Sequence, residues 1–415
     1  MEETRKYKQT ELGLLPEDWE VAKLGDIGYF LKGNGISKSQ ANSGDLCAVR
    51  YGELYTLHHN YIKTYNSHIS KEVALFATKI QKGDILFACS GETKEEIGKC
   101  AAFVDEVEAY AGGDILILRT DQEKCSDIFL GFLLNMPIAA NQKAAKGQGD
   151  AVVHISKASL ENLSIPLPHI EEQRRIASAL TSIDNLIDSL DRLIAKKRAI
   201  KQGAMQQLLS GKKRLKGFTE PWVEKKLGEI LSLKNGFAFK SETYCAIGKY
   251  KIITIANVQN GRLDLTDYNS VTEIPASIQQ HQKLSIGDIL ISMTGNVGRV
   301  CRVDSSNCLL NQQVGLLEIR PNVNSDFVFT ALNTNAFENA MRDKGQGAAQ
   351  ANISKSDIED YVLLMPSSEE EQSAIASVLT SMDNELSALE AKRKKYEQIK
   401  RGMMQQLLTG RIRLN

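Results

Sequence analysis

The amino-acid sequence contains one long segment twice. EEQRRIASALTSID, which starts at Glu171, returns as EEQSAIASVLTSMD at Glu370, and KQGAMQQLLSG at Lys201 returns as KRGMMQQLLTG at Lys400. Both pairs are 199 residues apart, so the segment is duplicated as a unit with no insertion inside it. An internal repeat of this kind decides the architecture, because each copy must fold in the same way.

Weaker matches lie upstream of each copy. Trp19 and Trp222 each precede an LG[DE]I segment, and KGQG occurs at Lys146 and again at Lys344. Each half therefore combines a domain that differs between the two copies with a helix whose sequence is nearly the same in both. The expected domains are residues 1–168, a first helix and linker at 169–217, a second domain at 218–366, and a second helix at 367–415.

The duplicated segment has the apolar spacing of a coiled coil, alternating four and three residues. No proline interrupts either copy, and Gly211 and Gly410 stand where a helix should stop. The pattern predicts two helices of roughly 38 residues, about 57 Å long. A helix of that length is unstable alone, so we expect the two copies to pair antiparallel about a pseudo-twofold axis. The seam residues are Ile176, Leu180, Ile183, Ile187, Leu190 and Ile194, and in the second copy Ile375, Leu379, Met382, Leu386 and Leu389.

The segments upstream of the helices have a different sequence pattern. Short apolar runs such as DILFA at Asp84 and DILISM at Asp288 alternate with loops rich in Gly, Asn and Ser, which is typical of strands. Helical stretches follow them, for example at Asp127 and Asp326. The predicted fold class is α+β, with two globular domains separated by a long antiparallel coiled coil of two helices.

Composition limits the class of protein. Lys plus Arg equal Asp plus Glu at 51 each, and only residues 169–217 are clearly basic, with 11 against 5. Since phosphate neutralisation drives non-specific DNA affinity, such a chain should bind DNA modestly unless a partner adds positive charge. The 7 cysteines form no CxxC pair, which favours free thiols. The charged start and the absence of a long apolar run favour a cytoplasmic protein without membrane attachment.

Polar loops recur at matched places in both domains. Asn, Gln, Ser, Arg and Lys can read the donor and acceptor pattern of base edges, although turn formation alone also selects Gly, Asn and Ser. The predicted DNA-facing residues are Asn34, Lys38, Thr93, Lys94 and Gln148 in the first domain, and Lys240, Asn257, Asn296, Arg299, Gln312 and Gln313 in the second.

Signatures of catalysis are missing. The sequence has no Walker-type GxxxxGK[ST], no GxGxxG after a strand, no HExxH, no GxSxG and no NPPY-like motif. His58 and His59 lack the spacing of metal ligands and are expected at the surface. The acidic residues around Asp18 are expected to form a solvated N-terminal segment. We expect neither a catalytic residue nor a metal site in this chain.

With its duplicated EEQ…IAS.LTS.D…MQQLL[ST]G helix and the Trp…LG[DE]I opening of each domain, the chain resembles the specificity subunit of type I restriction-modification systems. The resemblance implies two target recognition domains, each of which reads half of a split, asymmetric sequence in double-stranded DNA. It also implies that the helices hold the domains apart and dock two modification subunits, which bind S-adenosylmethionine and methylate adenine. Restriction subunits join this complex, and the specificity subunit binds no cofactor itself.

Two other functions stay open at this point. The chain could be a coiled-coil scaffold for protein interactions or, less in keeping with the missing motifs, a single-chain DNA methyltransferase or nuclease. Binding of S-adenosylmethionine by the purified chain would favour the enzyme, and failure to retain bipartite DNA with the partner would favour the scaffold.

The near-identity of GAMQQLLSG and GMMQQLLTG exceeds what coiled-coil packing needs. It suggests two equivalent docking patches for the modification subunits, although the same residues could instead cap the helix pair internally. On the docking interpretation, a chain truncated from Met403 onward should fold and bind one partner. The predicted partner-binding residues are Met205, Leu208, Leu209, Met404, Leu407 and Leu408.

Overall fold

The structure, a computed structural model, describes residues 6–345 and 351–414 and divides into two compact units. Unit 1 comprises the chain up to Asp191 together with the segment from Ala391, and unit 2 comprises Arg192–Glu390. Each unit therefore contains one globular domain, the beginning of one long helix and the end of the other. The α+β class and the duplicated plan are confirmed, whereas the exact domain boundaries stay a prediction.

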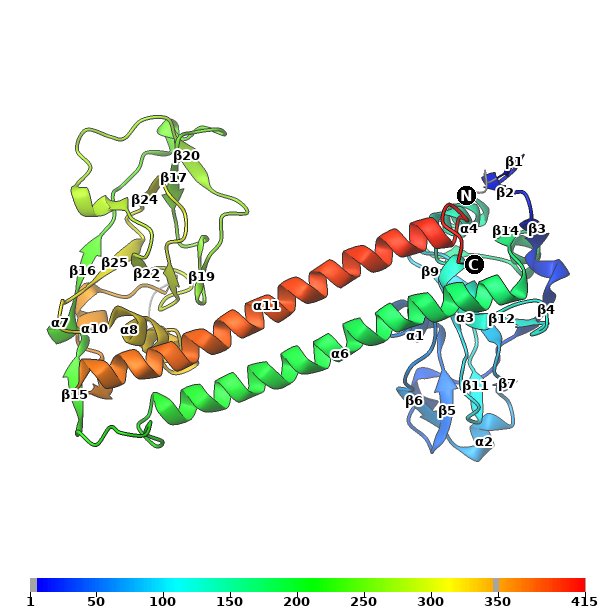
Figure 1. The fold of residues 1–415 in the computed structure, drawn as a ribbon, viewed down its shortest axis with the longest axis horizontal. Coiled ribbons are helices and arrows are strands. Elements are labelled where there is room, and N and C mark those ends of the chain that lie inside the picture. The colour runs from blue at the N-terminus through cyan, green and yellow to red at the C-terminus, as the bar shows by residue number, and fades with distance from the viewer. Residues whose placement is uncertain (1–5, 346–350, 415) are drawn as a thin grey trace, which may run out of the picture. The chain divides into compact units, whose positions relative to one another are not determined.

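The two long helices, α6 (Ile170–Leu208) and α11 (Glu369–Leu407), have 39 residues each (Figure 1). Their side chains pair antiparallel within each unit. In unit 1 Lys400 Nζ lies 2.5 Å from Asp184 Oδ1, and in unit 2 the repeat-equivalent Lys201 pairs with Asp383. The Lys201 pair, whose Asp383 side chain is 53% exposed, contributes at most about 1 kcal/mol. In the Lys400 pair the Asp184 side chain is only 9% exposed. Both pairs are consistent with the antiparallel register.

Glycines end both helices, as the sequence indicated. Gly211 and Gly410 have φ of 66° and 69°, the left-handed region that L-residues avoid. Within the seam, Ile183, Ile187 and Leu190 are buried. The first seam residues of each helix, such as Ile176, belong instead to a domain core.

Unit 1 contains two four-stranded sheets, in the orders β10-β8-β12-β4 and β6-β5-β11-β7. The first is antiparallel throughout, and the second contains one parallel pair, β5 with β11. The elements are β1 (Tyr7–Thr10), β2 (Gly13–Pro16), β3 (Glu20–Lys23), β4 (Gly28–Lys32), β5 (Leu46–Val49), α1 (Tyr51–Thr56), β6 (Ser67–Ile69), α2 (Lys71–Ala74), β7 (Thr78–Ile80), β8 (Asp84–Ala88), β9 (Ser90–Gly91), β10 (Cys100–Ala102), β11 (Ala109–Ala111), β12 (Ile115–Thr120), α3 (Asp127–Leu133), α4 (Pro137–Lys146), β13 (Val153–His154), α5 (Lys157–Glu161) and β14 (Ser164–Leu167).

Unit 2 repeats this topology, with sheets β23-β22-β25-β16 and β20-β17-β24-β21 and the parallel pair β17 with β24. Its elements are β15 (Trp222–Lys226), α7 (Leu227–Ile230), β16 (Leu231–Asn235), β17 (Tyr250–Ile253), β18 (Val258–Gln259), β19 (Arg262–Leu263), β20 (Asn269–Val271), β21 (Lys283–Leu284), β22 (Ile289–Ser292), β23 (Val300–Arg302), β24 (Cys308–Leu310), β25 (Val314–Ile319), α8 (Ser325–Leu332), α9 (Asn335–Lys344), α10 (Lys355–Glu359) and β26 (Val362–Pro366).

The central strand β8 is buried along its whole length, which explains the apolar run of its last four residues. Its first residue, Asp84, is buried as an ion pair with Arg119. Because side chains alternate across a strand, Ile85 and Phe87 join the core that faces the long helices, while Leu86 and Ala88 join a second core on the opposite face. In unit 2, Ile289 and Leu290 of β22 divide in the same way. Each domain thus has one face committed to the helices.

Candidate nucleic-acid and partner interfaces

In unit 1 the globular domain is fastened to both long helices by a buried ionic cluster, which we call clamp 1 (Trp19, Glu172 and Arg413). Trp19 is fully buried and donates from Nε1 to Glu172 Oε2 at 3.1 Å. Arg413, which follows α11, donates from Nη2 to the same oxygen at 2.7 Å. A second carboxylate, Asp18, accepts from Nη1 and Nη2 of Arg413 at 2.8 and 2.6 Å. Asp18 is exposed, as expected of a solvated segment, but its carboxylate also forms this ion pair, which the sequence did not indicate.

Unit 2 contains the equivalent clamp 2 (Trp222, Glu371 and Arg214). Arg214, which follows α6, donates from Nε and Nη2 to Glu371 Oε1 and Oε2, each at 2.6 Å. Trp222 Nε1 donates to Glu371 Oε1 at 3.3 Å. No second carboxylate joins this arginine among the ion pairs of the described residues, and its Nη2 donates to the backbone oxygen of Glu220 instead.

The glutamine of each EEQ motif also binds its own domain. Gln173 Oε1 accepts from the backbone N–H of Ser126, and Gln372 Oε1 accepts from that of Asn324. Ser126 and Asn324 are the N-caps of α3 and α8. The duplicated EEQ therefore has a structural explanation, because it joins each helix to the domain that precedes it.

The predicted partner-binding leucines divide by burial. Leu407 and Leu408 lie in the core of unit 1, and Leu208 lies in the core of unit 2, so internal packing accounts for these three. Leu209 is half-buried, as are Met205 and Met404. The docking prediction is left with these three half-buried residues.

The expectation for truncation from Met403 needs correction. Such a chain would lose Leu407 and Leu408 from the unit 1 core and Arg413 from clamp 1. Because Glu172 would then be buried without its cation, unit 1 should lose stability rather than only a partner site.

Most predicted DNA-facing residues are exposed. The exposed side chains are Asn34, Lys38, Thr93, Lys94, Gln148, Lys240, Asn296 and Gln312, and Gln313 is half-buried. The structure brings some of them together. Strands β9 and β13 pair Ser90 with His154, and Gln148 exchanges backbone hydrogen bonds with His154, so the loops that carry Thr93, Lys94 and Gln148 meet.

Two predicted residues have other roles. Asn257 is only 2% exposed, and its amide accepts from Thr254 and donates to the backbone oxygens of Asp264 and Asp267. Arg299 donates to Gln259 Oε1 at 2.9 Å, and its Nε lies 3.6 Å from Glu338. Both side chains take part in contacts between loops, and their reading of bases stays a prediction.

Sequence reasoning missed a polar pair at matched positions in the two domains. Ser90 Oγ lies 3.0 Å from His154 Nδ1, and Thr294 Oγ1 lies 3.2 Å from Asn352 Oδ1. The signal was present in HISK and NISK, which differ only at this position. Residues 346–350 of the second of these loops lie outside the described residues.

The remaining candidates for chemistry in the sequence were the histidines and the cysteines. His58 is 2% exposed, so its expected surface position was wrong, and burial lowers its pKa. All seven cysteines are free thiols. Across residues 6–345 and 351–414, no group of three or more His, Cys, Asp or Glu side chains is placed to hold a metal ion. Nor does any helix in that part of the chain have the length and apolarity to cross a membrane.

Comparison with known proteins places this geometry in a family. The type I restriction modification DNA specificity domain matches residues 16–197 and 219–401. The chain is 27% identical over 425 residues to the type I restriction enzyme MjaVIII specificity subunit of Methanocaldococcus jannaschii, covering 96% of this chain and 94% of that protein. It is 29% identical over 433 residues to the putative MjaX specificity subunit of the same organism, covering 98% and 97%.

The fold is also shared with a solved structure. The crystal structure of a type I restriction-modification S subunit from M. genitalium superimposes with a TM-score of 0.62 at 16% identity, over 98% of this chain and 99% of that one. Both repeats are thus matched in sequence and in fold.

Proposed function

Because this chain belongs to the family of type I restriction-modification specificity subunits, we propose that it reads a bipartite, asymmetric target in double-stranded DNA. Each unit reads one half-site with its globular domain. The chain itself binds no cofactor and performs no catalysis. It positions two modification subunits, which carry S-adenosylmethionine and methylate adenine, and restriction subunits join them in the cytoplasm.

The observation that carries the proposal is that the two domains share one sheet topology but differ in the polar side chains of their loops. The two four-stranded sheets of unit 1 match those of unit 2 strand for strand, yet His154 beside Ser90 is replaced by Asn352 beside Thr294. Exposed Lys94 and Gln148 stand near the first pair, and exposed Asn296 near the second. Different donors and acceptors on one scaffold suit two different half-sites.

Replacement of residues 218–366 by the matching domain of another such subunit tests the proposal. Methylation mapping in a host with the whole system should then show one half-site changed and the other kept. If both halves changed together, the two domains would not read DNA independently. Partner-dependent retention of bipartite DNA separates this function from a protein-binding scaffold.

A further inference from the structure

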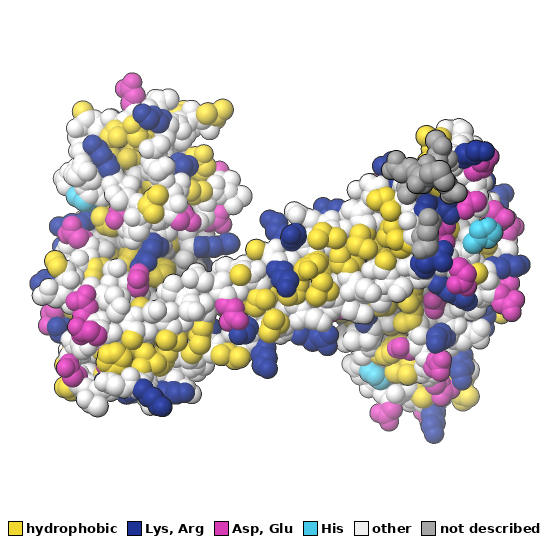
Figure 2. Space-filling model, in the orientation of Figure 1, with side chains coloured by type: hydrophobic (Ala, Val, Ile, Leu, Met, Phe, Trp, Pro, Cys, Tyr) yellow, Lys and Arg dark blue, Asp and Glu magenta, His cyan; other side chains and the backbone are white. Residues whose placement is uncertain are grey.

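Unit 2 has an open groove beside the end of α6, with a volume of about 940 Å³. Its floor includes the half-buried Met205 and Leu209 of the duplicated motif, and Ala336 of α9 lies on its wall. Strand β26 forms another wall, where Val362 is 49% exposed and Leu364 is 38% exposed. In Figure 2 hydrophobic side chains appear at the surface along the long helices, interspersed with Lys and Arg.

Among the described residues, none forms a hydrogen bond to the outer backbone edge of β26, whose Val362 and Leu364 line this groove. Leu227 N donates to Tyr361 O, and β26 runs antiparallel to β15 with Val362 opposite Lys226. In an antiparallel pair, residues alternate between bonding to their partner strand and pointing away from it. The N–H and C=O groups of Val362 and Leu364 therefore point away from β15.

In unit 1 the equivalent edge is closed. Ser164 of β14 corresponds to Val362, and its N–H and C=O are both bound by the amide of Gln142, at 3.1 and 2.9 Å. Two residues later Pro166, which corresponds to Leu364, has no N–H to offer. Unit 2 has Ala340 in place of Gln142, and its methyl group can bind neither backbone atom.

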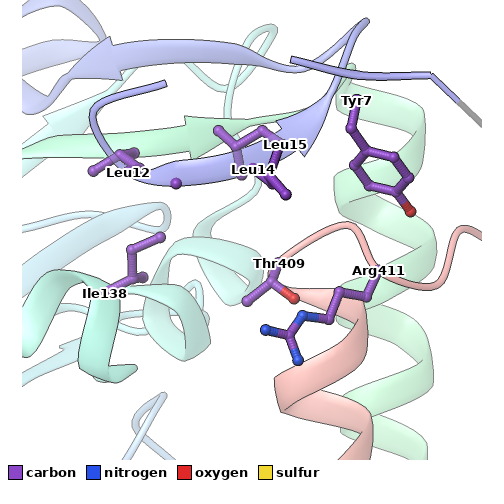
Figure 3. A pocket seen from close by; sticks show the side chains of 8 residues that line it. Tyr7, Leu12, Leu14, Leu15, Ile138, Thr409 and Arg411 are labelled. Atoms are coloured by element: carbon purple, nitrogen blue, oxygen red, sulfur yellow. The ribbon is translucent and has the colours of Figure 1, made fainter. Parts of the chain in front are cut away.

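Unit 1 also covers the same face with its own chain. The hairpin of β1 and β2 lies against the end of α11, where Tyr7 Oη donates to Gly410 O at 3.4 Å. Figure 3 shows Leu12 and Leu14 of this hairpin above Ile138, with Thr409 and Arg411 on the opposite side of the pocket. Ile138 and Thr409 correspond to Ala336 and Ser210, both of which line the groove of unit 2. An apolar extended segment is thus what this face accepts.

We propose that the groove of unit 2 binds an extended, leucine-containing segment of a modification subunit by strand addition to the outer edge of β26. Backbone hydrogen bonds to Val362 and Leu364 would provide affinity, and Met205 and Leu209 would contact alternate side chains of the segment. This inference rests on the proposed function and extends it, since it makes the two partner sites unequal. The segment enters unit 2 directly, whereas at unit 1 the hairpin occupies its place, so the two partners bind stepwise.

The test closes the outer edge of β26 in unit 2 with the residues that close the equivalent edge of β14 in unit 1. Ala340→Gln should place an amide on Val362 as Gln142 does on Ser164, and Leu364→Pro removes one outward N–H as Pro166 does. Each full-length variant is titrated with purified modification subunit and its complexes are weighed in solution. We expect the tighter of the two dissociation constants to rise at least tenfold. Asn339→Gln, at the exposed neighbouring position of α9, is the matched control and should bind as the wild type does.

Amide hydrogen exchange gives a second readout that docking on the helices alone would not move. The amides of Val362 and Leu364 should exchange quickly in the free chain and become protected in the wild-type complex. Unchanged exchange at both amides, or unchanged dissociation constants in both folded variants, would overturn the strand-addition proposal while leaving the family function intact. A wild-type chain that binds no modification subunit at all would contradict the function on which it rests.

Discussion

The two clamps fasten their domains with the same three residue types but draw the arginine from different places. In unit 1 it is Arg413, after the end of α11, and in unit 2 it is Arg214, after the end of α6. Each domain is therefore bound to the helix that follows it and locked by the chain that leaves the other helix. The comparison teaches that intrachain docking, applied twice, accounts for much of the duplicated helix sequence.

Breaking clamp 1 should have the largest effect. Arg413→Met leaves Glu172, whose side chain is 4% exposed, without its cation. Removal of one partner of a buried ion pair costs about 3–5 kcal/mol. In a Trp222→Phe background Trp19 is the only tryptophan, so its fluorescence during urea unfolding reports on unit 1.

The equivalent variant in unit 2 tests whether the loss of stability is confined to the unit whose clamp is broken. Arg214→Met in a Trp19→Phe background should destabilise unit 2, as reported by Trp222. Combining Arg413→Met with Glu172→Gln should recover part of the loss, because no uncompensated charge then remains buried. If Arg413→Met left the unfolding midpoint unchanged, the clamp would not hold the domain.

The next comparison is between two leucines at one position of the repeat. Leu408→Ala empties a fully buried site in the unit 1 core and should cost about 2–5 kcal/mol. Leu209→Ala, in the open groove of unit 2, should cost much less stability and should weaken binding of the modification subunit instead. Equal losses of stability in both variants would show that the groove is part of the unit 2 core.

These leucines also show what the sequence could predict. The repeat identified the helices, their ends and the family, because spacing and identity are local properties of the chain. The sequence could not show that Leu408 is a core residue and Leu209 a groove residue. The two leucines occupy the same position of the repeat, but the hairpin before Trp19 covers only the copy that contains Leu408. The loop-closing contacts of Asn257 could not be foreseen for a similar reason, because turn closure and base reading select the same side chain.

A smaller effect is expected within the second domain. Gln312→Ala removes an exposed amide and should cost about 1–3 kcal/mol of binding at a single base position. Asn257→Ala leaves buried backbone oxygens without donors and should cost about 1–3 kcal/mol of stability instead. Methylation of a set of single-base variants of the target separates the two results. A change of base preference in Asn257→Ala at wild-type stability would show that it reads a base after all.

The smallest effect concerns pH, and it should occur in unit 1 alone. The hydrogen bonds from Arg413 lower the pKa of Asp18 below its ordinary value of 3.8, and unit 2 has Pro221 at the corresponding position. A lowered pKa in the folded state stabilises unit 1 above the unfolded pKa, and this contribution is lost as the pH falls through the folded pKa. Because the Asp18 side chain is 48% exposed, the contribution should stay below about 1 kcal/mol.

In the Trp222→Phe background, Asp18→Asn should therefore lower the urea midpoint slightly at pH 7 and match its parent near the acid limit of folding. A difference that persisted or grew as the pH fell would mean that Asp18 stabilises unit 1 by some means other than its charge.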